Sequence, residues 1–91
     1  MYGRELILMM SNFLNGNYDA EAFSFDFPER LSEVYEELLR ENQPLCDCLE
    51  EDMPEICSWY DPHDTGDEGT YGLEEFKKKV NGVYLKAVTL V

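Results

Sequence analysis

The sequence predicts an all-α protein, an antiparallel four-helix bundle formed by a single domain over residues 1–91. Four segments carry apolar side chains at three- and four-residue spacing, which is the pattern of amphipathic helices. The length favours one domain, and the 44% of hydrophobic residues excludes intrinsic disorder. Strand-like alternation is absent, apart from a β-branched stretch at residues 88–91.

The first two helices are predicted at residues 4–14 and 20–41. The first ends at the Asn-Gly-Asn sequence of residues 15–17, because glycine supplies the left-handed residue of a C-terminal cap. Asp19 is the expected N-cap of the second helix. Because Pro28 lies inside that helix, we expect either a kink there or two pieces that meet at the proline.

The third helix is predicted from Pro44 to about Tyr60, and the fourth at residues 73–89, after a polar loop at residues 61–72. Pro54 is expected on the solvent side of the third helix, where it bends the helix around the core. The core-facing arc of the third helix is predicted to hold Leu45, Cys48, Leu49, Met53, Ile56, Trp59 and Tyr60.

The charge is strongly negative and unevenly distributed. The chain has 20 Asp and Glu against 7 Lys and Arg, for a net charge of −13. Residues 41–76 hold twelve of the acidic residues and no Lys or Arg. Such a surface repels phosphate backbones and anionic lipids, so we expect no direct binding of nucleic acid or membranes. The partner of this segment should be basic.

The acidic residues of the third helix give a more specific indication. Asp47, Glu50, Glu51 and Glu55 project from its polar face. The pairs Asp47–Glu51 and Glu51–Glu55 place like charges four residues apart, each at a cost of about 0.2–0.5 kcal/mol. A solvated polar face explains any one of these residues. The whole run is explained better by a basic partner that relieves the repulsion.

Catalysis and metal binding are not expected, and no cofactor is expected either. The single histidine lies in an acidic loop, and no nucleophile–base pair or phosphate-binding glycine loop is present. Cys46 and Cys48 point 200° apart on a helix, so we expect Cys48 in the core, flanked by Cys46 and Cys57, and no zinc site. The odd number of cysteines and the absence of a targeting segment favour the cytoplasm.

Calcium is the closer alternative among metals. An EF-hand-like loop that begins at Asp64 places Gly69 at position 6 and Glu75 at position 12. Gly66 and Glu68 then occupy positions 3 and 5, where Asp or Asn is typical. This leaves a degenerate calcium-binding module as an alternative.

Two segments of the chain resemble the colicin D immunity protein family, whose members include immunity proteins of contact-dependent growth inhibition systems. Residues 13–23 (FLNGNYDAEAF) are similar to the first helix–turn–helix of that family. Residues 59–62 (WYDP) and 71–80 (YGLEEFKKKV) resemble the end of its third helix and its fourth helix. The resemblance implies a four-helix protein that neutralises a cognate bacterial toxin, typically a tRNA-cleaving nuclease domain.

The expected mechanism is stoichiometric 1:1 occlusion of a basic nuclease active site, without chemistry by this chain. Acidic residues supply the charged contacts, and two tyrosines at the shoulders of the loop act as aromatic anchors. Trp59 is expected in the core instead. The predicted partner-binding residues are Asp47, Glu50, Glu51, Glu55, Tyr60, Asp61, Asp64, Asp67, Glu68 and Tyr71.

The alternative from another class is a DNA mimic that inhibits a DNA-binding protein. A DNA mimic needs carboxylates spaced like phosphates over a long surface. Here the acidic residues concentrate in one third of a small chain, which favours a compact groove as the target.

Overall fold

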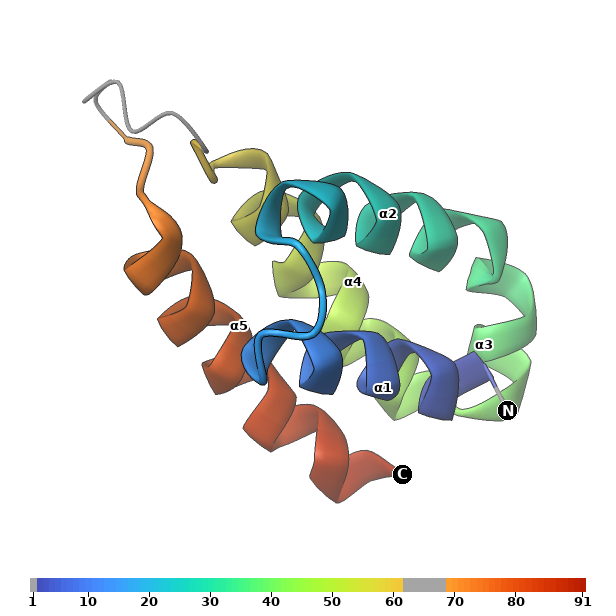
Figure 1. The fold of residues 1–91 in the computed structure, drawn as a ribbon. Coiled ribbons are helices and arrows are strands. Elements are labelled where there is room, and N and C mark those ends of the chain that lie inside the picture. The colour runs from blue at the N-terminus through green and yellow to red at the C-terminus, as the bar shows by residue number, and fades with distance from the viewer. Residues whose placement is uncertain (1, 62–68) are drawn as a thin grey trace.

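The computed structural model describes residues 2–61 and 69–91, which form five α-helices and a short terminal 3₁₀ helix (Figure 1). The elements are α1 (Tyr2–Leu14), α2 (Ala20–Glu33), α3 (Tyr35–Glu41), α4 (Gln43–Ser58), α5 (Leu73–Ala87) and η1 (Val88–Leu90). No strand occurs in these ranges, which confirms the all-α prediction. In Figure 1, α1 and α2 run side by side in opposite directions, and α5 crosses α1 obliquely.

The two ends of α1 are fixed by different interactions. At its start, the carboxylate of Glu41 accepts hydrogen bonds from the amides of Tyr2 and Gly3, at 3.2 and 3.1 Å. At its end, Gly16 adopts a positive φ of 82°, and the Asn17 amide donates to the carbonyl of Asn12 at 2.8 Å. The predicted helix stop at residues 15–17 is therefore confirmed.

The chain from residue 20 to residue 41 is divided, but not at the proline. Asp19 is the N-cap of α2, and its side chain accepts from the Ala22 amide at 3.0 Å, as predicted. Pro28 lies inside α2 without ending it, and it is half-buried beside the hollow that it lines with Pro54 of α4. The helix ends instead at Val34, which has φ −102° and ψ 9°. The segment does form two helices, but they meet at Val34, so the prediction that they meet at Pro28 is wrong.

The remaining helices begin and end close to their predicted limits. Asn42 caps α4 by accepting from the Leu45 amide at 3.2 Å, and Pro44 occupies the first turn. Asn42 also donates to the Leu90 carbonyl at 2.6 Å, which holds the end of the chain against the start of α4. The helix α4 ends at Ser58, two residues before the predicted limit.

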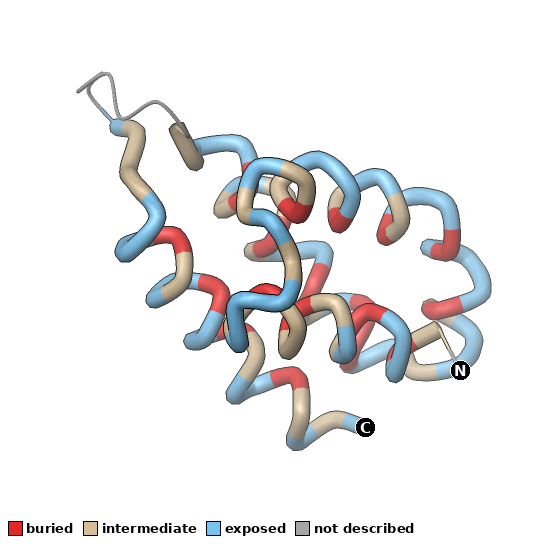
Figure 2. Tube along the Cα trace, in the orientation of Figure 1, coloured by how far each residue is buried: buried red, intermediate tan, exposed pale blue. Residues whose placement is uncertain are grey.

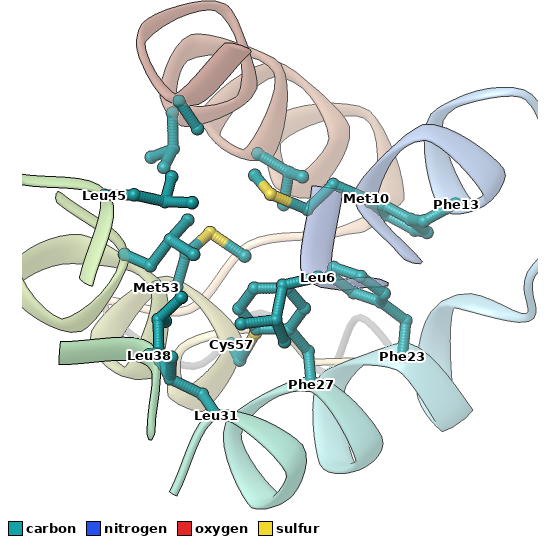
Figure 3. Close-up of a cluster of buried hydrophobic side chains, with 14 of the residues drawn as sticks. Leu6, Met10, Phe13, Phe23, Phe27, Leu31, Leu38, Leu45, Met53 and Cys57 are labelled. Atoms are coloured by element: carbon teal, nitrogen blue, oxygen red, sulfur yellow. The ribbon is translucent and has the colours of Figure 1, made fainter. Parts of the chain in front are cut away.

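One core of apolar side chains joins all five helices (Figures 2 and 3). Within the described ranges no polar side chain is buried. The largest fully buried residues are Phe13, Phe23, Phe27, Phe76, Leu6, Met10, Leu31, Leu38, Leu45, Leu49, Met53 and Val80. The ring of Phe76 contacts those of Phe13 and Phe23, with centroids 4.9 and 6.0 Å apart.

The buried face of α4 differs from the predicted arc. Cys46 and Cys57 are buried and Cys48 is half-buried. The prediction that Cys48 lies in the core, with Cys46 and Cys57 at its flank, is therefore wrong. The reason is that α4 packs against three helices, α2, α3 and α5. Residues over a wider arc of α4 than predicted, including Cys46 and Cys57, are therefore buried. Trp59 is 43% exposed and not in the core, although its amide still donates to the Glu55 carbonyl at 3.1 Å as in a helix. Its ring lies beside Gly69 instead of entering the core.

No helix within residues 2–61 and 69–91 combines the length and the apolar composition that crossing a membrane requires.

Candidate protein-binding surface

The four predicted acidic contacts of α4 lie together on its outer side. Asp47, Glu50, Glu51 and Glu55 are all exposed. Among the described residues, none of the four forms a salt bridge. The like-charge pairs four residues apart are therefore present as predicted, and no described Lys or Arg side chain lies within salt-bridge distance of them.

Three further acidic residues adjoin α4 from the neighbouring helices. Glu33 at the end of α2 and Glu36 and Glu37 of α3 line a depression of about 450 Å³ together with Glu50. Tyr35, which is 38% exposed, and Ser32 complete its wall. We call the seven residues of this region the acidic surface: Glu33, Glu36, Glu37, Asp47, Glu50, Glu51 and Glu55.

The sequence analysis did not predict that acidic residues of α2 and α3 belong to this surface, because it considered only the net charge of long segments of the chain. Arg30 and Arg40 offset the acidic residues of the first 40 positions in that net charge. A local pattern was available, since Glu33, Glu36 and Glu37 are spaced as Asp47, Glu50 and Glu51 are, at three and four residues. Equal spacing on two adjacent helices indicates two acidic faces that can adjoin.

Arg30 marks the edge of the acidic surface. Its guanidinium donates to both carboxylate oxygens of Glu5 in α1, at 2.9 and 3.2 Å, and lies 3.5 Å from Glu33. The ring of Tyr2 is 5.8 Å from the guanidinium carbon. These interactions, led by the hydrogen bonds to Glu5, raise the pKa of Arg30. The cation is thus directed toward α1 and away from α4.

The two predicted aromatic anchors are joined to each other beyond the end of α4. Tyr60 and Tyr71 form an isolated parallel bridge. The Tyr71 amide donates to the Trp59 carbonyl at 3.2 Å, and the Asp61 amide donates to the Tyr71 carbonyl at 3.0 Å. The Tyr71 hydroxyl donates to the carbonyl of Ile56. The described shoulders of the loop are therefore held against the last turn of α4.

Both tyrosines also pack on the core. The Tyr60 ring stacks on that of Phe76 at 4.4 Å, and the Tyr71 ring lies 6.4 Å from it. Burial, with the charges of Asp19, Glu21 and Asp61, raises the pKa of Tyr60. Burial raises the pKa of Tyr71 to about 12, with smaller effects from Cys57, Glu55 and Glu75. Each tyrosine thus keeps a half-buried ring beside acidic groups.

The other loop contacts have different positions. Asp61 is half-buried at the bridge. The predicted contacts Asp64, Asp67 and Glu68 lie outside the described residues. The structure thus brings Glu50 of α4 together with Glu33, Glu36 and Glu37. It places Tyr60, Asp61 and Tyr71 at one end of α4.

The described residues contain no group of three or more His, Cys, Asp or Glu side chains that could hold a metal ion. The three cysteines are free thiols, and burial is the main cause that raises the pKa of each, to about 12 for Cys57. A raised pKa disfavours the thiolate that zinc requires. In the EF-hand-like alignment, Asp64, Gly66 and Glu68 lie outside the described residues.

Comparisons of the chain with protein-family models, with curated proteins and with solved structures found no match.

Proposed function

We propose that this chain is an immunity protein that binds a cognate toxin nuclease 1:1 and neutralises it by covering its basic active site. The proposed toxin is a tRNA-cleaving domain of the colicin D or contact-dependent growth inhibition type, as the sequence resemblance implies. The chain itself performs no chemistry and acts in the cytoplasm. The alternative is inhibition of a DNA-binding protein by mimicry of DNA.

The acidic surface is the observation that carries this proposal. Its seven carboxylates come from three helices, and within the described residues only Glu33 lies within salt-bridge distance of a cation. Like charges at this density destabilise the free chain. A basic partner removes the repulsion when it binds, so the arrangement costs stability in the free state and strengthens the complex.

A nuclease provides the required complement. An enzyme that cleaves RNA holds phosphate groups in a basic groove. Carboxylates on a rigid helical scaffold can occupy the same groove and exclude the substrate. Opposite charges also accelerate association, to about 10⁸–10⁹ M⁻¹ s⁻¹ at low salt. Fast binding is what protection from a nuclease requires.

The proposal includes the bundle arrangement that the resemblance implies. In this interpretation α2 and α3 act as one bent helix, since Val34 alone separates them. The Val34 carbonyl also accepts from the Leu38 amide at 2.8 Å, which joins this residue to α3. With α1, α4 and α5, this gives an antiparallel four-helix bundle.

The test is coexpression with the nuclease domain encoded beside this gene. We expect that domain to stop growth when expressed alone and the chain to restore growth and copurify at 1:1. Glu51→Lys and Glu55→Lys should slow association. Glu29→Lys is the matched control, because Glu29 is exposed on the side of α2 that faces α1.

Two results would overturn the proposal. One is a neighbouring domain that neither stops growth nor binds the chain. The other is equal association rates for the α4 variants and Glu29→Lys. Capture of a non-nuclease DNA-binding protein, competed by duplex DNA, supports DNA mimicry instead.

A further inference from the structure

Two hollows, one of them also bounded by α3, lie one after the other along the seam between α2 and α4, and we call them together the groove. Ser24, Pro28 and Ser32 recur every four residues on α2, and Glu50, Pro54 and Ser58 do so on α4. Ser24, Phe25, Pro28, Pro54, Ser58 and Tyr60 line a hollow of about 420 Å³. The depression of the acidic surface, lined by Ser32 and Glu50, occupies the next stretch of the same two helices. The groove is thus apolar at one end and acidic at the other.

The apolar end contains the most exposed large hydrophobic residue of the described chain. Phe25 is 68% exposed, although its neighbours Phe23 and Phe27 are fully buried. Phe25 makes no contribution to the core cluster. Exposed aromatic side chains beside a hollow are typical of binding sites, where they act as anchors for a partner.

The two prolines interrupt the regular hydrogen bonding of both helices beside the groove. Proline has no amide hydrogen, so the carbonyls of Ser24 and Glu50, four residues before Pro28 and Pro54, cannot receive the regular helical bond. Both carbonyls belong to residues that line the groove.

We propose that this groove receives a cationic amphipathic helix of the partner protein. An apolar side chain of that helix packs against Phe25 and the two prolines, and its Lys or Arg side chains lie among the carboxylates at the other end. The lining from Ser24 to Glu33 spans about 14 Å at 1.5 Å per residue, so the bound segment is about nine residues of helix. A third helix laid between two packed helices is a common mode of recognition.

Charge complementarity selects this occupant over a second copy of the chain. Each copy carries a net charge of −13, so two copies repel each other over most of their surfaces. The inference rests on the proposed function for a basic partner. It adds which element of that partner binds, and where.

A synthetic peptide tests the inference without a nuclease. The probe has about 14 residues, or about 21 Å of helix, with Leu and Arg along one face and Ala and Gln elsewhere. A scrambled peptide of the same composition is the control ligand. Binding is followed by amide chemical shifts of the labelled protein.

We expect saturable binding, with shifts concentrated in residues 24–37 and 50–60. Phe25→Ser should weaken it at least about tenfold, in line with loss of a central anchor. Leu85→Ser is the matched control, because Leu85 is 58% exposed on α5, and it should bind like the wild type. Both substitutions are at exposed sites, and circular dichroism confirms that each variant folds.

The inference is overturned if the peptide does not bind saturably, if the shifts map to another face, or if both variants bind alike. Self-association that Phe25→Ser abolishes would also overturn it, since the groove would then hold a second copy. If the peptide does not bind but the neighbouring nuclease does, the groove is rejected and the proposed function stands. If the peptide binds but the neighbouring nuclease does not, the proposed function is rejected and the groove stands.

Discussion

Reversal of the charge at Glu51 is expected to stabilise the free chain. Glu51 is exposed in α4, with Asp47 four residues before it and Glu55 four residues after it. Each like-charge pair costs about 0.2–0.5 kcal/mol, and each opposite-charge pair contributes a similar amount. Glu51→Lys changes both pairs, so the four terms add up to about 0.8–2 kcal/mol. Solvent exposure reduces the expected gain to about 1 kcal/mol.

Urea denaturation of the wild type and the variant measures this difference. A gain of about 1 kcal/mol corresponds to a rise in melting temperature of about 4–8 °C for a chain of this size. Because the effect is electrostatic, it should largely disappear at about 1 M salt, where the Debye length is about 3 Å.

Glu74→Lys distinguishes local repulsion from net charge. It changes the net charge by the same amount, but Glu74 lies in the first turn of α5, four residues before Lys78. That substitution removes a favourable pair and a favourable interaction with the helix dipole, so it should destabilise the chain. If both variants gain stability equally, net charge is responsible. If Glu51→Lys gains nothing, the argument from α4 is refuted.

Three further predictions concern the core and the loop shoulders. Phe76→Ala should cost about 3–5 kcal/mol in a urea titration, since the ring is fully buried; a loss below about 1 kcal/mol would contradict this. Gly69→Ala should lower thermal stability by about 1–3 kcal/mol, because Gly69 has φ +90° and a Cβ would lie 2.8 Å from Trp59 Cζ3. Folding raises the pKa of Tyr71 from 10.0 to about 12, because burial favours its neutral form. Its contribution to the free energy of unfolding is therefore complete below pH about 10 and is lost as the pH rises through about 12. Denaturation at a series of pH values should therefore show a weaker alkaline loss for Tyr71→Phe, and an unchanged profile would refute it.

Most helix limits could be predicted because they depend on local interactions. Asp19, Gly16 and Asn42 act on the few residues beside them, and the helices begin or end where these residues occur. The break at Val34 depends on tertiary packing. Val34 is itself buried, as are Leu31 before it and Leu38 after it, and no local signal distinguishes this position from Pro28.

The same distinction applies to the candidate surface. Helical spacing alone placed the acidic residues of α4 on one side. The depression shared by Glu33, Glu37 and Glu50 requires the angle between two helices, which spacing within one helix does not contain. The exposure of Trp59 has a related cause, because its ring lies beside Gly69, and spacing within α4 does not contain the position of Gly69.

The most direct test of the proposed function is the association rate constant between this chain and the domain encoded beside its gene, which we propose to be its nuclease target, measured at low and high salt. We expect fast association at low salt and a steep decrease as salt rises. We also expect slower association for Glu51→Lys and Glu55→Lys and a near wild-type rate for Glu29→Lys. A rate independent of salt and equal for all three variants would contradict the claim that the acidic surface is the binding surface.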